Sequence, residues 1–243
     1  MHMGSMAAHD CCANTAWTIL RNGIYTLRAL VPITMNENVT ITYTEPTQGT
    51  LIRRQKLLES KYFECTCRRC SDPTELNSYF SAVKCGAHED LAGNYFPLDP
   101  LSHSSAWKCD TCGDIKTVQW IQKVVKDIKE EIDELSGSED SISSVEKLEN
   151  MLQANSGIRV HENHFEMLRL ENEILQRISY FMSLNNGSNI TKNLSTKLAD
   201  RMIQLSEKCL AVVDMIWPGY NRFRGMLFSY CIIAWFVLND VIS

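Results

Sequence analysis

The spacing of hydrophobic residues changes along this chain. Before about residue 45 the apolar positions form short β-favouring runs, whereas from residue 118 onward they recur at helical spacing. Runs at residues 15–20 and 24–31 flank Arg21, Asn22 and Gly23, a turn signal that predicts a β-hairpin. Pro32 ends the second run, and residues 39–43 resume the alternation of a half-buried strand. The pattern therefore predicts a front part rich in β-structure.

A helix is predicted over residues 50–62, where leucines alternate with charged residues as in an amphipathic helix. The apolar positions are Leu51, Leu57 and Leu58. The charged positions between and beside them are Arg53, Arg54, Lys56 and Glu59. Residues 71–117, which follow, are rich in prolines and glycines and are predicted to be mostly loop.

The rest of the chain is predicted to be helical. Stop signals rich in Asn, Ser, Gly and Pro separate four segments with helical periodicity, near residues 118–135, 144–154, 161–184 and 192–215. The apolar stretch 226–238 is shorter than the roughly 18 residues that span a bilayer, so a buried terminal helix is expected and no membrane partner. Helical hairpins of this length resemble tetratricopeptide stacking, although the repeat signature is missing.

Charge and cysteine content narrow the functional class. The chain has 243 residues and a net charge of −5, so it lacks the basic character of nucleic-acid-binding domains, and no direct nucleic-acid binding is expected. Ten cysteines follow a start that contains no secretory signal. In a reducing compartment, clustered cysteines are metal ligands more often than disulfides. These features indicate a cytoplasmic and/or nuclear protein.

Cys65, Cys67 and Cys70 place three thiolates within six residues. A tetrahedral zinc site takes four ligands, so a fourth must come from elsewhere in the chain. Cys11 and Cys12 are the upstream candidates, and Cys85 is a downstream alternative. A zinc ion here would join a short knuckle to a distant loop.

A second set of ligands lies in the loop-rich part. Two pairs about twenty residues apart match the spacing of a zinc ribbon, and Gly113 follows the second pair with the backbone freedom that such a knuckle needs. The predicted ligands are Cys85, His88, Cys109 and Cys112. His103 is an alternative to His88, which could also be an ordinary solvated loop residue. The sequence therefore predicts two zinc ions per chain.

These motifs resemble a known family. Residues 9–14 read His-Asp-Cys-Cys-Ala-Asn and are similar to the Asn-His-Ser-Cys-x-Pro-Asn motif of SET-domain lysine methyltransferases. Residues 65–70 resemble the post-SET cysteine cluster, and residues 30–43 resemble the segment that ends in the strand of the catalytic tyrosine. Similarity to the SET and MYND family, particularly its arthropod branch, extends to three further segments, namely the second cysteine module, residues 161–165 and residues 218–225. The resemblance covers roughly residues 5–228.

The resemblance implies a role for each position. Tyr43 would be the active-site tyrosine, and Cys11 would complete the zinc site of the post-SET cysteines. His9 would contact S-adenosylmethionine through its backbone, and Phe63 would pack on the adenine. Ala8 stands where the motif has a cofactor-binding Asn. The implied activity is methylation of a lysine in a protein or peptide, a histone being one candidate.

The implied fold is of the α+β class. A zinc-stabilised, β-rich partial SET domain, the β-clip, and a post-SET region would precede a helical, tetratricopeptide-like C-terminal domain. We expect the C-terminal part of the SET domain at 1–49, the post-SET zinc region at 50–72, the zinc-ribbon-like module at 73–117 and the helical domain at 118–243.

Departures from the motif favour a truncated enzyme. No Gly-x-Gly precedes His9, Ala13 replaces the motif's Pro, and Lys61 stands where the family often has a second tyrosine. We therefore expect a chain that lacks the N-terminal cofactor-binding strands and has little or no activity. The alternative is a non-catalytic, zinc-stabilised interaction or transcription-regulatory module. In that case the acidic stretch 130–149 would bind a partner, although a solvated helix face explains it equally well.

Overall fold

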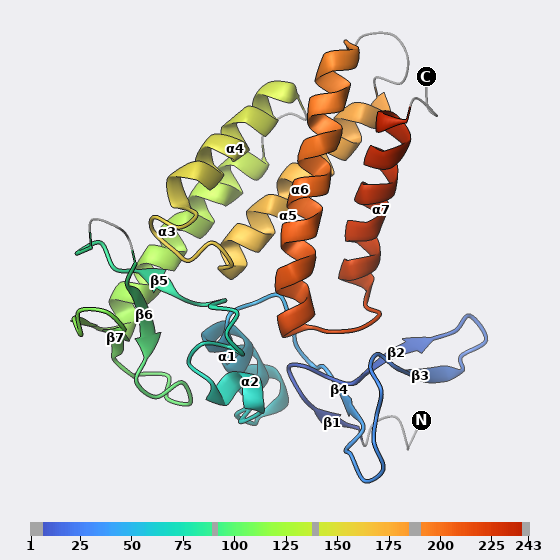
Figure 1. The fold of residues 1–243 in the computed structure, drawn as a ribbon. Helices are drawn as coiled ribbons and strands as arrows, with labels where there is room; N and C mark the ends of the chain where they lie inside the picture. Colours follow the sequence, from blue (N-terminus) through green and yellow to red (C-terminus); the bar gives the residue numbers. More distant parts are fainter. Residues whose placement is uncertain (1–6, 89–91, 138–140, 185–190, 240–243) are drawn as a thin grey trace.

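The computed structural model describes residues 7–88, 92–137, 141–184 and 191–239 (Figure 1). At the front, strand β1 (Ala8–His9) pairs in parallel with β4 (Thr40–Ile41), with His9 opposite Ile41. The strand predicted over residues 39–43 is thus only two residues long. It ends early because the backbone N–H of Tyr43 donates to Nδ1 of the His9 ring at 3.0 Å instead of continuing the ladder.

The predicted hairpin is present. Strands β2 (Thr15–Ile19) and β3 (Tyr25–Ala29) are antiparallel, with Ile19 opposite Tyr25. Gly23 has a φ of 80°, a conformation that residues other than glycine rarely adopt, and it closes the turn. The hairpin projects from the body of the molecule at the lower right of Figure 1.

The predicted helix after the front strands is also present, but it buries a different face. Helix α1 (Thr50–Lys61) is followed by its C-cap Tyr62, which is left-handed with a φ of 60°, and then by the short helix α2 (Arg68–Ser71). The buried positions of α1 are Thr50, Arg53, Arg54 and Leu57, at the i, i+3, i+4, i+7 spacing of one helix face. Leu58 is exposed. The buried face thus carries two arginines beside Leu57, whereas the charged residues of an amphipathic helix are expected to face solvent.

Between residues 83 and 116, the described residues form a sheet of four short antiparallel strands in sequential order. Its strands are β5 (Val83–Lys84), β6 (Asn94–Pro97), β7 (Trp107–Cys109) and β8 (Ile115–Lys116). The sequence predicted loops here because strands of two to four residues show no alternation of apolar and polar positions.

The helical part follows the prediction closely. Its helices are α3 (Val118–Ser136), α4 (Ile142–Asn155), α5 (Phe165–Leu184), α6 (Lys192–Ile216) and α7 (Arg222–Leu238). Neighbours in sequence contact one another from α3 to α7 (Figure 1). Tetratricopeptide-like stacking remains a prediction.

Helix α5 begins later than the predicted residue 161. The N–H of His161 donates to the carbonyl of Ala82 at 3.0 Å, and the N–H of Phe165 donates to that of Phe80 at 3.0 Å. Residues 161–164 therefore lie against the segment before β5 rather than in the helix.

The terminal helix α7 is only half buried. Leu227, Tyr230 and Ala234 face the other helices, whereas Ile232 and Trp235 are each 55% exposed. Among the described helices, none combines the length and the apolar character that crossing a membrane requires.

The turn between α6 and α7 lies against the front part. Gly219, with a φ of 89°, approaches Leu30 so closely that an added Cβ would lie 2.1 Å from the Leu30 carbonyl oxygen. The Cys12 thiol donates to the carbonyl of Ile216 at 3.1 Å. These contacts join the end of α6 to the loop that carries the upstream cysteines.

Candidate metal centres and an aromatic cluster

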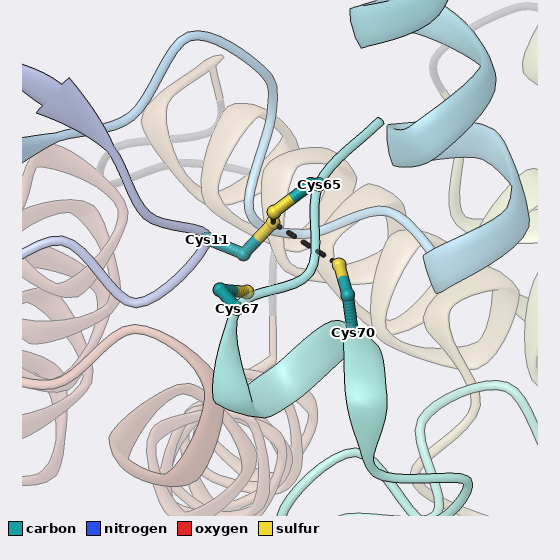
Figure 2. A group of neighbouring side chains, drawn as sticks. All are labelled: Cys11, Cys65, Cys67 and Cys70. Atoms are coloured by element: carbon teal, nitrogen blue, oxygen red, sulfur yellow. Dashed lines mark hydrogen bonds between the residues drawn. The ribbon is translucent and has the colours of Figure 1, made fainter. Parts of the chain in front are cut away.

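The four cysteines of the first predicted zinc site converge. Cys11 follows β1, Cys65 and Cys67 lie in the segment between α1 and α2, and Cys70 lies on α2 (Figure 2). All four sulfurs lie within 4.8 Å of one another. The Cys11 sulfur is 4.0 Å from that of Cys65 and 3.5 Å from that of Cys70. Tetrahedral Zn–S bonds of about 2.3 Å place sulfurs roughly 3.5 to 4 Å apart, so the donor set fits zinc.

The other candidates for the fourth ligand lie elsewhere. The Cys12 sulfur faces the Ile216 carbonyl, and burial raises the pKa of its thiol to about 11. Cys85 belongs to the second group of ligands. The structure thus brings Cys11, and neither alternative, to Cys65, Cys67 and Cys70.

Two polar side chains contact this cluster from outside. Nε2 of His9 lies 3.3 Å from the Cys11 sulfur. Because Nδ1 of the same ring accepts from Tyr43, the ring proton is on Nε2 and points to the sulfur. Nε of Arg53 donates to the Cys11 sulfur at 3.3 Å. Hydrogen bonds from the other three cysteines, with a weaker one from His9, lower the pKa of the Cys11 thiol.

A buried ion network lies behind the cluster. Arg53, Arg69 and Glu75 are each at most 1% exposed. Oε2 of Glu75 accepts from both arginines, at 2.9 Å from Nη1 of Arg53 and 2.8 Å from Nη2 of Arg69. Burial by itself would raise the pKa of Glu75, but the two guanidinium groups lower it by more, so the pKa is about 2. The sequence does not reveal this network, because charged residues of an amphipathic helix are expected to face solvent.

The ligands of the second site converge on the small sheet. Cys85, His88, Cys109 and Cys112 place their ligand atoms within 4.8 Å of one another. The Cys85 sulfur lies 3.8 Å from that of Cys112, and the Cys109 sulfur lies 3.6 Å from Nε2 of His88. Gly113 has the expected positive φ, 76°. One imidazole and three sulfurs also fit zinc.

The alternative ligand His103 does not reach this site. Its Nε2 lies 2.9 Å from the Glu64 carboxylate, with the side chain of His103 37% exposed. His88 is therefore the histidine that the structure brings to the cysteines.

Gly93 is a position of the second site that the sequence did not reveal. A Cβ there would lie 2.6 Å from Cδ2 of His88 and 2.7 Å from the Cys109 sulfur. Its carbonyl also accepts from the N–H of Cys85 at 2.9 Å. The backbone at Gly93 thus approaches two ligands at a distance that no side chain allows.

Substituting Gly93 should release the metal of this site. In Gly93→Ala we expect elemental analysis to show loss of about one zinc per chain, because the methyl group must displace His88 or Cys109. Gly86→Ala is the matched control, since an added Cβ there meets nothing within 4 Å. Equal zinc content in the two variants would contradict the expectation.

Three aromatic rings gather beside the first cluster. The His9 ring centroid lies 5.4 Å from that of Tyr43 and 5.8 Å from that of Phe63. Tyr43 meets Phe63 edge to face at 6.4 Å. The Tyr43 hydroxyl donates to the carbonyl of Ala7 at 2.5 Å. Tyr43, Phe63 and His9, the residues with implied catalytic or cofactor roles, thus share one location, and Ala8 lies next to them on β1.

An open pocket of about 510 Å³ borders Tyr43. The first half of its lining comes from the segment after β4 and the second half from the end of α1. The charged groups in the lining are Glu45, Lys56 and Glu59. Lys61 lies near this pocket, with Nζ 5.8 Å from the centroid of the Tyr43 ring.

A search of family models finds none that matches the chain. Among curated proteins, the SET domain-containing protein SmydA-8, isoform A, of Drosophila melanogaster is 31% identical over 107 residues, covering 44% of this chain and 23% of that protein. A SET and MYND domain-containing protein of Dictyostelium discoideum is 28% identical over 45% of this chain and 31% of its own length. The histone-lysine N-methyltransferase ASHR1 of Arabidopsis thaliana is 26% identical over 49% of this chain and 25% of its own length.

These proteins share a SET-domain or lysine-methyltransferase name, and the cysteine clusters agree with that class. Over about half of its length, the chain is similar to SET and MYND domain proteins. The matched part spans between 23% and 31% of these three relatives.

Proposed function

We propose that this chain forms the part of a SET-type, S-adenosylmethionine-dependent protein-lysine methyltransferase that carries the tyrosine and the post-SET zinc site. One observation carries the proposal. The His9 ring accepts from the backbone of Tyr43 and donates to the sulfur of Cys11, so a single side chain joins the aromatic cluster to the cysteine cluster. The alignment with lysine-methyltransferase relatives supports the same conclusion.

Each residue then has a physical task. S-adenosylmethionine, when bound, supplies the methyl group. Phe63 offers an aromatic face for the adenine, and His9 fixes the backbone beside it. Tyr43 would orient the substrate amine through its hydroxyl, because a straight approach of nitrogen to the methyl carbon supplies much of the rate gain. Ala8 has no hydrogen-bonding side chain and can contribute only its backbone.

The substrate in this proposal is a lysine of a protein or peptide, a histone being one candidate. The lysine must be neutral to react, and removal from water favours its neutral form. Glu45 and Glu59 in the pocket beside Tyr43 would face basic residues that flank the target lysine. Lys56 lines the same pocket and Lys61 lies near it, and their positive charges weaken that attraction.

We expect this chain by itself to bind S-adenosylmethionine more weakly than micromolar. The Tyr43 hydroxyl already donates to Ala7, and Ala8 lacks the hydrogen bond of the family's Asn. One lost hydrogen bond costs about 1 kcal/mol, roughly fivefold in affinity. Isothermal titration calorimetry measures this directly, with a complete SET and MYND protein as the positive control. Micromolar binding would contradict this expectation.

A zinc-stabilised interaction module without catalysis is the second candidate. A mostly apolar cavity of about 220 Å³ favours it, with Ile52, Pro97, Trp107 and Phe165 in its lining. The acidic stretch 130–149 does not favour it, because several of its carboxylates pair within the fold. These pairs are Glu130 with Lys126, Glu131 with Arg159, Asp133 with Arg169 and Glu149 with Arg201.

The two candidates can be separated by photocrosslinking S-adenosylmethionine to the zinc-loaded chain. Labelling of the segments that contain His9 or Phe63 favours the enzyme. No labelling, with both zinc ions in place, favours the interaction module.

A further inference from the structure

Arg53 contacts the first cysteine cluster in an unusual way. Its Nε donates to the Cys11 sulfur at 3.3 Å, and its Nη2 lies 3.6 Å from the Cys70 sulfur. One guanidinium therefore reaches two of the four sulfurs, which come from segments 59 residues apart. The side chain is fully buried, and a guanidinium stays charged in proteins.

The charge of the cluster explains why such a donor matters. Four thiolates around one Zn²⁺ leave a net negative charge, and three of these cysteines are buried. Buried charge is costly unless it is paired and hydrogen-bonded. Arg53 supplies a permanent positive charge at the sulfurs, while His9 supplies a neutral N–H at Cys11.

The orientation of Arg53 is fixed from its other side. Nη1 pairs with Glu75 at 2.9 Å and donates to the Gln48 carbonyl, and Nη2 donates to the Thr50 hydroxyl at 2.9 Å. Glu75 also holds Arg69, whose Nη1 lies 3.4 Å from the carbonyl of Ile216 at the end of α6. The network thus extends from two metal-binding sulfurs to the helical part of the chain.

We propose that Arg53 is a positioning residue of the first metal centre, which neutralises its thiolates and slows the release of zinc. This inference rests on zinc binding at that cluster. Substitution of hydrogen-bonding partners behind metal ligands typically weakens metal affinity by about 10- to 100-fold. The loss of Arg53 should lie in this range because one side chain serves two ligands.

The second metal centre provides an internal control. The polar groups at its Cys85 sulfur are the backbone N–H of Ala87 and the Tyr95 hydroxyl, at 3.3 Å, which donates to Asp114, and neither carries a positive charge. A change at Arg53 should therefore leave the release of the second zinc unchanged.

The test is the rate of zinc transfer from the zinc-loaded full chain to a chromogenic chelator. Zinc release from the wild-type chain should show two phases, one for each site. The Cys112→Ser variant shows which phase belongs to the first cluster, because the zinc that remains in it is the one at that cluster. In Arg53→Met the first phase should accelerate by about 10- to 100-fold. In Arg53→Lys it should accelerate less, because an ammonium keeps the charge but cannot reach both sulfurs and Glu75 together. If the Arg53→Met variant does not fold, the Arg53→Lys variant provides the test.

Arg69→Met is the matched control. Arg69 is equally buried and shares Glu75, but its hydrogen bonds go to Glu75 and to backbone carbonyls rather than to sulfur. If both Arg53 variants release zinc at the wild-type rate, the role of Arg53 is overturned, whereas the assignment of the metal site is unaffected. Equal acceleration in Arg69→Met would also overturn that role, because general loosening would then explain the effect. A wild-type chain with no zinc at the first cluster would overturn the metal site as well.

Discussion

Removal of zinc by a strong chelator should unfold the region around both metal centres. Around the first centre, the buried apolar residues are Leu57 and the ligand cysteines, with Tyr43, Phe63 and Leu101 packed against them. A structural zinc contributes on the order of 10 kcal/mol to small folds of this kind. The loss of β-structure should be visible by circular dichroism. Elemental analysis of the untreated protein should show two zinc ions per chain, and fewer than one would contradict the expectation.

Two adjacent cysteines allow a matched control for this experiment. Cys11→Ser should lose the first zinc, because Cys11 is the ligand that comes from the upstream segment. Cys12→Ser should keep both zinc ions, because the Cys12 sulfur faces the Ile216 carbonyl. Loss of zinc in Cys12→Ser, with retention in Cys11→Ser, would reverse the assignment of the fourth ligand.

Replacement of Glu75 by Gln should give the second largest effect, a loss of about 3 to 5 kcal/mol in the free energy of unfolding. Glu75 is the carboxylate that both buried arginines share, so its loss leaves two buried positive charges without it. Glutamine has nearly the same shape, and the change therefore isolates the charge. Urea denaturation of the zinc-loaded protein measures it.

Glu131→Gln is the control for an exposed ion pair. The Glu131 side chain is 47% exposed and lies 2.8 Å from Nη1 of Arg159, whose side chain is 34% exposed. Exposed pairs are worth about 0 to 1 kcal/mol, so this variant should remain close to the wild type. Similar, small losses in the two variants would show that the buried network contributes little to stability.

Short-range patterns in the sequence predicted much of the molecule. Cys65, Cys67 and Cys70 lie within six residues, and the chain cannot separate them far in space. The turn at Gly23 and the periodicity of the last helices are local in the same sense. For these features, neighbouring residues carry enough information.

The features that were missed depend on contacts between distant segments. From the sequence, Arg53 and Arg54 are expected to face solvent. The partner of Arg53 is Glu75, which lies 22 residues away, so the local pattern does not indicate it. Glu75 is also the first of three consecutive left-handed residues, with φ values of 50°, 64° and 59° at Glu75, Leu76 and Asn77. Of these residue types only asparagine commonly adopts that conformation, so the sequence gives little indication of the turn. The need for glycine at position 93 likewise arises only once His88 and Cys109 approach it.

The buried core has a consequence for dividing the protein into shorter pieces. One continuous cluster of buried residues includes Phe80 and Val83 before and within the small sheet, Trp107 on β7, and Leu170 and Val213 on the long helices. A chain cut after residue 117 would expose one half of that cluster on each product. The carbonyl of Ile216 would also be removed from Arg69 and Cys12. Genetic dissection would therefore yield fragments that lack a closed interior, whereas point substitutions can probe each metal centre within the intact chain.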